Sequence, residues 1–145
     1  MEAEPEPAVP PSLSEPLFEA VRAGDKRSVA SQLAKAKGAG HDLNAFEELG
    51  GQTLLMVAAR HGHLSVVKLL LEQGADAHAR NAADKTALHI AVWKGHRDVV
   101  SCLCQEHADW SISDVYGRTA LMTAAMRGDV AIVRLLLEQC SKGEL

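Results

Sequence analysis

Three stretches of this 145-residue chain share one pattern: Thr53-Leu-Leu-Met-Val-Ala-Ala-Arg-His-Gly62, Thr86-Ala-Leu-His-Ile-Ala-Val-Trp-Lys-Gly95 and Thr119-Ala-Leu-Met-Thr-Ala-Ala-Met-Arg-Gly128. Their threonines are 33 residues apart, and so are their glycines. A fixed period with a common core is typical of stacked repeats, in which neighbouring units bury a shared core. The chain is therefore predicted to form a solenoid of repeated units.

Each unit is expected to be a pair of helices. The threonine hydroxyl can cap the first helix, Ala58 and Ala59 recur at helical spacing with apolar neighbours, and Gly62 ends the helix where a left-handed residue costs least. A second helix is predicted from Leu64 to Gln73, and Gly74-Ala-Asp76 then turns the chain outward. Aromatic residues make up only 3% of the chain, and a core of Ala, Leu and Val suits closely packed helices.

The recurring motifs resemble the ankyrin repeat. They are Thr-x-Leu-His (intact as Thr86-Ala87-Leu88-His89), the Gly-His that follows the first helix, and Val-Val-Lys-Leu-Leu-Leu-Glu-Gln-Gly-Ala-Asp, which ends at Asp76. The resemblance covers Gly51–Leu145. It implies an all-α solenoid of helix-turn-helix units joined by short outward β-hairpin turns.

A first, divergent repeat precedes the regular ones, because Leu17-Phe-Glu-Ala-Val-Arg-Ala-Gly24 is similar to a first helix with its glycine. Gly24 and Gly62 are 38 residues apart, so this unit carries about five extra residues, four of them between Gly24 and Gly40. The predicted organisation is a disordered tail at 1–16, the divergent repeat at 17–47, and regular repeats at 48–80, 81–113 and 114–145.

The tail prediction rests on composition. All five prolines lie within residues 1–16, together with four glutamates and no basic residue, and such a segment buries too little apolar surface to order itself. Its Pro7-Ala-Val-Pro10 also fits a polyproline ligand. From Gly51 to Leu145 ten acids balance ten bases, so the chain as a whole is not expected to bind polyanions.

Cysteine usage and hydropathy bear on the compartment. Three cysteines form no disulfide framework, no secretory signal is recognised, and no run reaches the roughly 18 apolar residues of a membrane span. The expected location is the cytoplasm, the nucleus or both.

Two departures from the family pattern fall in one repeat. The hairpin glycine, present as Gly51 and Gly117, is Asp84 in the middle unit, and the glycine that closes the second helix, Gly74, is His107 there. A side chain at a left-handed position is strained, so the repeat at 81–113 is predicted to be the least ideal.

The last predicted helix, with Ile132, Val133 and Leu135 to Leu137, is apolar where a solenoid usually presents a polar capping face. An uncovered apolar flank is therefore expected. Two explanations stay open: the chain is part of a longer array, or the flank is covered by self-association.

Chemistry-bearing clusters are few. The candidates for a metal site are His61-Gly-His63 and Cys102-Leu-Cys104 with His107, but the second lacks the paired spacings of zinc sites. Cys102 and Cys104 lie about 200° apart around a helix, so one buried and one partly exposed thiol are expected. No phosphate loop, nucleophile elbow or carboxylate pair appears. The prediction is a protein with no catalytic residue, cofactor or metal, and therefore not an enzyme.

The three histidines of the repeats are assigned structural roles. His63 and His96 follow a helix-ending glycine and are expected to make local backbone bonds. His89 follows the family pattern and is expected to bond to a neighbouring hairpin.

The resemblance implies that partners dock on a concave side made of hairpin tips and the outer ends of the first helices. Carried over by register, the predicted partner-binding residues are Arg60, His61, Arg80, Lys85, Trp93, Lys94, Tyr116, Arg118, Met126 and Arg127. Most of them are basic, and His61 is able to add charge. Trp, Tyr and Arg are the residues most enriched at binding hot spots.

The roles of the two tryptophans need separate consideration, and two alternatives stay open for Trp93. Trp93 is either an exposed anchor or a lid folded over a small core, and Trp110, in an outward turn, is expected to pack between repeats. With Trp93 as an anchor, the surface is predicted to bind an acidic protein segment with apolar anchors.

The leading function is a protein-protein interaction module, an adaptor or scaffold. The alternatives are a direct inhibitor of a kinase or transcription factor, and a targeting domain of a larger protein. Nucleic acid is not the expected partner, because the tail is acidic and the basic face carries few aromatic residues.

Overall fold

The computed structural model describes residues 9–143. The predictions for residues 1–8, including the start of the polyproline match, lie outside this range. The elements in chain order are α1 (Pro11–Ala23), α2 (Lys26–Gly38), the 3-10 turn η1 (Leu43–Ala45), β1 (Glu47–Glu48), β2 (Gln52–Thr53), α3 (Leu54–His61), α4 (Leu64–Glu72), α5 (Ala87–Lys94), α6 (Arg97–Gln105), α7 (Ala120–Arg127) and α8 (Val130–Gly143).

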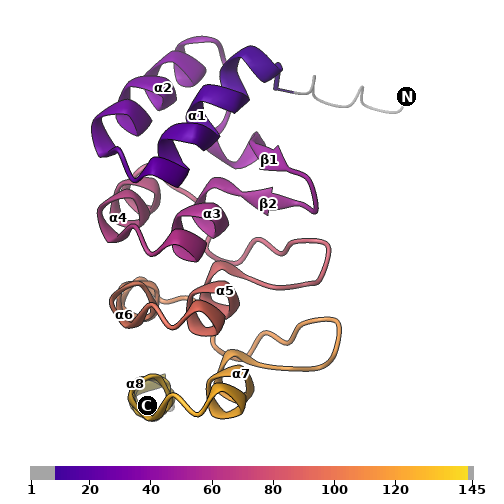
Figure 1. The fold of residues 1–145 in the computed structure, drawn as a ribbon, viewed down its shortest axis with the longest axis vertical. Coiled ribbons are helices and arrows are strands. Elements are labelled where there is room, and N and C mark those ends of the chain that lie inside the picture. The colour runs from indigo at the N-terminus through magenta and orange to yellow at the C-terminus, as the bar shows by residue number, and fades with distance from the viewer. Residues whose placement is uncertain (1–8, 144–145) are drawn as a thin grey trace.

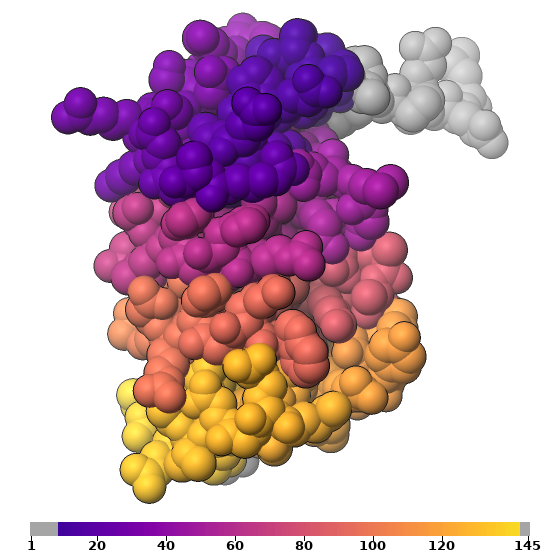
Figure 2. All heavy atoms as spheres, viewed as in Figure 1, coloured from indigo at the N-terminus to yellow at the C-terminus, as the bar shows by residue number. Residues whose placement is uncertain are grey.

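The helices form two parallel rows, with the hairpins projecting on one side (Figure 1). Helices α1, α3, α5 and α7 pack in one row, and α2, α4, α6 and α8 pack in the other. The space-filling view shows the units as successive bands along the long axis (Figure 2). The predicted all-α solenoid of helix pairs is therefore confirmed. No helix in the described range is both long enough and apolar enough to span a membrane.

The threonines cap the first helices, as the sequence predicts. Oγ1 of Thr53, Thr86 and Thr119 accepts a hydrogen bond from the backbone N–H three residues later, at 3.2, 3.4 and 3.3 Å. This satisfies one of the N–H groups that a helix start leaves unpaired. Each cap thus fixes where the chain leaves the hairpin and enters the helix.

Small side chains allow neighbouring helices to pack closely. Ala58, Ala91 and Ala124, one period apart, are fully buried where neighbouring helices meet. Leu55 and Leu88 are each 1% exposed beside them. Fully burying one such leucine contributes about 1.5–3 kcal/mol, so the repeated apolar face supplies most of the stabilisation.

The extra length of the first unit lies mainly in its second helix. Helix α2 has 13 residues, whereas α4 and α6 have nine each. The difference of four matches the insertion predicted between Gly24 and Gly40.

The predicted limit of the tail was wrong, because α1 begins at Pro11 and residues 11–16 are helical. Proline is tolerated in the first helical turn, where its missing N–H has no partner to lose. Leu13 packs against the core one turn before Leu17 and extends the apolar stripe of the helix. The prolines of residues 11–16 therefore concealed a helical pattern of apolar residues that begins before Leu17 and continues through Pro16.

The backbones of His63 and His96 make the local bonds that were predicted, because their N–H groups donate to the carbonyl oxygens of Ala58 and Ala91 at 3.1 and 3.0 Å. Their side chains make longer-range bonds that were not predicted. Nε2 of His63 donates to the carbonyl oxygen of Arg22 at 2.8 Å, and Nε2 of His96 donates to that of Arg60 at 3.0 Å. Each bond joins a repeat to the last turn of the first helix of the preceding repeat. In the last repeat Asp129 takes this position and pairs with Arg97 at 3.5 Å.

Further hydrogen bonds join consecutive turns. On the hairpin side, the N–H of Ala82 donates to the carbonyl oxygen of Gly50 at 2.9 Å. The N–H of Val115 donates to the carbonyl oxygen of Ala83 at 3.1 Å. On the opposite turns, the N–H of Asp76 donates to the side chain of Asn44 at 2.9 Å. Similarly, the N–H of Asp109 donates to His78 at 3.1 Å. Successive units are thus held in register along both edges.

The middle repeat carries the strain that was predicted for it. Asp84 has φ 56° and His107 has φ 63°, and these are the non-glycine residues with positive φ in the described chain. Left-handed backbone costs a side-chain-bearing residue roughly 1–2 kcal/mol. Both replacements for glycine therefore lower the intrinsic stability of this unit.

The predicted apolar flank of the last repeat is only partly exposed. Ile132 and Leu136 are fully buried, Val133 and Leu135 are half-buried, and Leu137 is exposed. Met122 is 51% and Leu137 is 49% exposed, whereas their register equivalents His89 and Cys104 are 3% and 7% exposed. His89 and Cys104 are buried in the repeat at 81–113, on whose helices α7 and α8 of the next repeat pack. Self-association through this flank stays a prediction.

Gly62 tests the link between the first helix of one repeat and the histidine of the next. It has φ +70°, and a Cβ built there would lie 2.6 Å from Nδ1 of His96. Gly62→Ala is expected to lower the free energy of unfolding by about 1–3 kcal/mol, measured by urea denaturation.

Gly38→Ala is the matched control, because Gly38 lies in α2 with nothing within 4 Å of a built Cβ. It should leave stability unchanged or raise it slightly. In a His96→Ala background the cost of Gly62→Ala should fall, since the steric part is gone. An equal cost in both backgrounds would contradict the proposed contact.

Candidate recognition surface

The ten predicted partner-binding residues lie at two kinds of position. Arg60, His61, Trp93, Lys94, Met126 and Arg127 are in or next to the last turns of α3, α5 and α7, and Arg80, Lys85, Tyr116 and Arg118 flank or form the second and third hairpin turns. We call this set the recognition face. All of its members are exposed except Lys85, which is half-buried.

Four of the ten come together around one cavity of about 150 Å³, which is lined by Lys85, Trp93, Arg118 and Met126. The hairpin turns supply Lys85 and Arg118, and α5 and α7 supply Trp93 and Met126. Two cationic side chains thus share a hollow with two apolar ones. Arg60, His61, Arg80 and Tyr116 do not line this cavity.

Trp93 is half exposed, at 49%, so it is not a lid closed over the core. The guanidinium of Arg127 lies 5.8 Å from its ring centroid, which is a cation–π distance. Arg127, at the end of α7, therefore contacts the Trp93 indole of α5 and restricts its orientation. Met126, 58% exposed, precedes Arg127 and lines the cavity with the indole.

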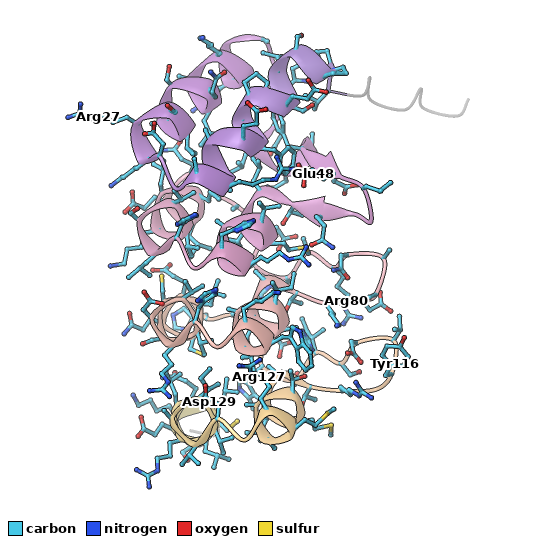
Figure 3. All side chains as sticks on the ribbon, in the orientation of Figure 1. Arg27, Glu48, Arg80, Tyr116, Arg127 and Asp129 are labelled. Atoms are coloured by element: carbon cyan, nitrogen blue, oxygen red, sulfur yellow. The ribbon has the colours of Figure 1, made fainter. Side chains whose placement is uncertain are left out.

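The hairpin side repeats this pairing of a cation with an aromatic ring. Arg118 lies 5.2 Å from the ring centroid of Tyr116, which is 72% exposed. Figure 3 places Arg80 and Tyr116 on the hairpin side and Arg127 beside the helices. Cation–aromatic pairs therefore occur both on the hairpin turns and at the ends of the first helices.

The six cations of this face form no ion pair with acids of the described chain, although Asp114 lines the cavity together with Lys85 and Arg118. The two ion pairs within residues 9–143 are Arg22–Glu48 and Arg97–Asp129. Neither includes Arg60, Arg80, Lys85, Lys94, Arg118 or Arg127. These six cations are therefore available to an acidic ligand.

The surroundings of His61 limit the pH range in which it can add positive charge. Burial, followed by repulsion from His63 and Arg60, lowers the pKa of His61 below its ordinary value. The rings of His61 and His63 are stacked with their centroids 6.0 Å apart. His61 therefore contributes positive charge only at acidic pH.

Three buried polar residues, His89, Asp114 and Thr123, also line the cavity. His89 is 3% exposed; its Nδ1 accepts from the N–H of Thr86 at 3.2 Å. Its Nε2 therefore carries the hydrogen and donates to the carbonyl of Arg118 at 3.1 Å. This bond confirms that His89 joins a neighbouring hairpin, and it fixes the backbone beside the Arg118 side chain.

Asp114 was missed by the sequence reasoning. It is 7% exposed, and its Oδ1 accepts from the N–H groups of Tyr116 and Arg118 at 2.9 and 3.0 Å. Burial opposes ionisation, but these backbone donors outweigh it and lower the pKa of Asp114. The carboxylate therefore shapes the third hairpin and adds one shielded negative charge to the cavity lining.

A signal for this role was present in the sequence. Asn81 stands 33 residues before Asp114, and its Oδ1 accepts from Ala83 and Lys85 in the same way. Asn and Asp side chains commonly bond their own backbone two residues later. The repeated Asx residue at this position marks the hairpin turn.

The cysteines differ from the prediction, because Cys102 and Cys104 are both 7% exposed. Helix α6 packs against α4, α5 and α8, so more than one of its faces is covered. Burial raises the pKa of Cys104 to about 11. Within residues 9–143 no three His, Cys, Asp or Glu side chains are grouped to hold a metal ion.

Trp110, 37% exposed, lines an open cavity of about 470 Å³ together with His78 from the preceding repeat and Gln139 from the following one. Trp110 is exposed and is not among the residues packed against the core, so the inter-repeat packing predicted for it stays a prediction.

His89 provides a pH test of the cavity lining. Burial lowers its pKa below the ordinary value of 6.5, so the unfolded chain binds more protons than the folded one as pH falls below 6.5. The stabilisation from neutral His89 should therefore be complete above about pH 6.5 and be lost progressively on acidification.

His89→Met is the matched variant, because methionine occupies the equivalent positions 56 and 122. By urea denaturation, wild type should exceed the variant by about 1 kcal/mol near pH 7.5, and the gap should narrow near pH 5.5. The other histidines are common to both proteins and cancel. A gap independent of pH would contradict the neutral, hydrogen-bonded His89.

Comparison with protein families agrees with this architecture. The family described as ankyrin repeats (3 copies) matches residues 17–114, and that described as ankyrin repeat matches residues 116–142. Ankyrin repeats are generally protein-protein interaction modules and are typically not enzymes. The chain belongs to the ankyrin-repeat family.

Proposed function

We propose that the recognition face binds an acidic segment of a partner protein that inserts an apolar side chain beside Trp93. The observation that carries this proposal is the cavity in which Lys85 and Arg118 share a hollow with Trp93 and Met126. An apolar group can be buried there while the cations face carboxylates on either side of it.

The distribution of charge supports an acidic ligand. Six cations on one face are unpaired with acids of the described chain, although residues 51–145 hold equal numbers of acids and bases. Concentrated positive potential speeds the encounter with an acidic segment, and salt weakens this effect.

The holding energy is assigned to the aromatic and apolar side chains. Trp93 and Met126 are about half exposed, and Arg127 restrains the Trp93 indole at cation–π distance. A restrained aromatic ring loses less entropy when a ligand packs against it. The partner's apolar anchor is therefore expected to contact the indole that Arg127 positions.

A peptide-display selection on the immobilised protein tests this function. Selected peptides should be enriched in Asp and Glu around an apolar residue. Their affinity for Trp93→Ala/Lys94→Glu should fall at least about tenfold, and its salt dependence should weaken.

Lys68→Glu is the matched control. Lys68 is exposed on α4, in the other row of helices, so the same charge change there should leave affinity unchanged. Equal thermal stability of the variants would exclude misfolding. Selected peptides without acidic enrichment, or equal loss of affinity in the control, would reject this face.

A further inference from the structure

A second hollow adjoins the recognition face at the last repeat. It has a volume of about 610 Å³ and is lined by Arg97, Arg127 and Arg134, with Asp129 and Val130 among the other residues. The three arginines come from the start of α6, the end of α7 and the first turns of α8. We call this hollow the arginine groove.

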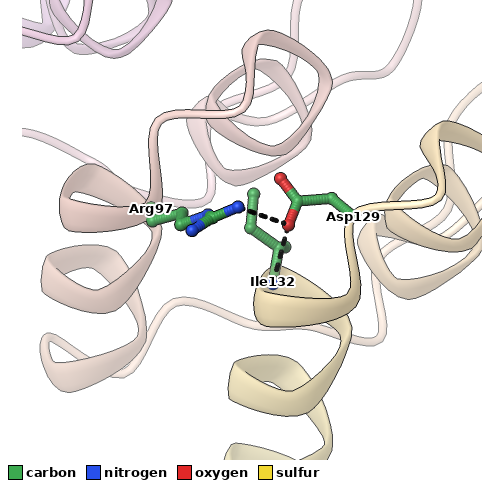
Figure 4. Close-up of polar contacts among 3 residues, drawn as sticks. All are labelled: Arg97, Asp129 and Ile132. Atoms are coloured by element: carbon green, nitrogen blue, oxygen red, sulfur yellow. Dashed lines mark hydrogen bonds and ion pairs between the residues drawn. The ribbon is translucent and has the colours of Figure 1, made fainter.

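Asp129, the single acid of the groove, is already engaged. Its Oδ1 accepts from the N–H of Ile132 at 3.2 Å and lies 3.5 Å from Nη2 of Arg97 (Figure 4). The Asp129 side chain is only 12% exposed, whereas that of Arg97 is 65% exposed. Arg97 can therefore turn its other donors to a ligand while Asp129 stays bonded to the helix start.

The charge balance of the groove distinguishes phosphate from carboxylate. Three arginines and one carboxylate leave a formal charge of two positive units. A phosphate monoester carries about −1.5 to −2 at neutral pH and has three acceptor oxygens, whereas a carboxylate carries a single negative charge. Planar guanidinium groups suit phosphate, because each can donate two parallel hydrogen bonds.

Arg127 connects the groove to the recognition face. Its guanidinium lies 5.8 Å from the ring centroid of Trp93 and also lines the groove. One ligand segment can therefore reach both places through neighbouring residues.

From this geometry we propose that the arginine groove binds a phosphorylated serine or threonine in the acidic partner segment, next to the residue that packs on Trp93. This inference rests on the proposed function and names the modification that strengthens binding at the same face. Phosphorylation of the partner would then act as the switch for recognition.

The test uses degenerate peptide pools selected for an apolar anchor, with a fixed phosphoserine, serine or glutamate, and measures binding by fluorescence anisotropy. Wild type should bind the phosphoserine pool about tenfold more tightly than the serine pool. Glutamate should recover only a small part of this gain.

Arg134→Gln tests the groove alone, since Arg134 is exposed and lies outside the recognition face. It should reduce the preference for phosphoserine to about threefold or less and leave the serine pool unaffected. Arg27→Gln is the matched control, because Arg27 is exposed on α2 at the far end of the array (Figure 3). It should retain the wild-type preference.

The outcomes separate the two proposals. Serine peptides that bind through Trp93 and Lys94 without gain from phosphate would overturn the groove and leave the proposed function standing. Equal binding of glutamate and phosphoserine, or a preference unchanged by Arg134→Gln, would also overturn it. Absence of binding by every pool would overturn both.

Discussion

Contact between consecutive helix pairs is the interaction on which the whole structure depends. A pair such as α5 and α6 has apolar side chains on faces that only α3 and α4 on one side and α7 and α8 on the other can cover. Buried alanines such as Ala91 allow the close approach, and His96 reaches across it to the carbonyl of Arg60. Because each unit depends on its neighbours, stability accumulates along the stack rather than within a unit.

Packing between consecutive helix pairs leaves one surface whose exposed side chains are not needed for the contact between repeats. Helix starts are occupied by the threonine caps, and the turns are occupied by bonds to the next unit. The last turns of α5 and α7 and the neighbouring hairpin residues face the cavity beside Trp93 instead. Under the proposed function, variation at these positions would change partner binding without disturbing the stack, and the cations and half-exposed apolar residues of this chain occupy them.

The fold was predictable because its determinants are local and repeated. The 33-residue spacing of Thr53, Thr86 and Thr119 gave the helix starts, and the missing glycines at Asp84 and His107 identified the strained repeat. Long-range bonds were not predictable in this way. Nothing in the sequence next to His63 indicates that its ring reaches Arg22, and the helical start at Pro11 was hidden by proline composition.

The shared face of the candidate residues was predictable from register, but their arrangement was not. Register placed Lys85, Trp93, Arg118 and Met126 on one face, but only the packed structure shows that they enclose a shared cavity. The ionised Asp114 that also lines it depends on backbone donors that form when the hairpin folds. The pairing of Arg127 with Trp93 likewise requires two adjacent repeats to be stacked.

Under the proposed function, ligands contact the hairpins and the first helices rather than the second row of helices. The most direct measurement is backbone amide chemical-shift mapping of the protein titrated with an acidic, apolar-anchored peptide. We expect chemical-shift changes at residues 80–85, 93–94, 116–118 and 126–127, with the amides of α4 and α6 unaffected. Shifts concentrated on α4 and α6, or on the exposed flank around Leu137, would contradict the proposed function.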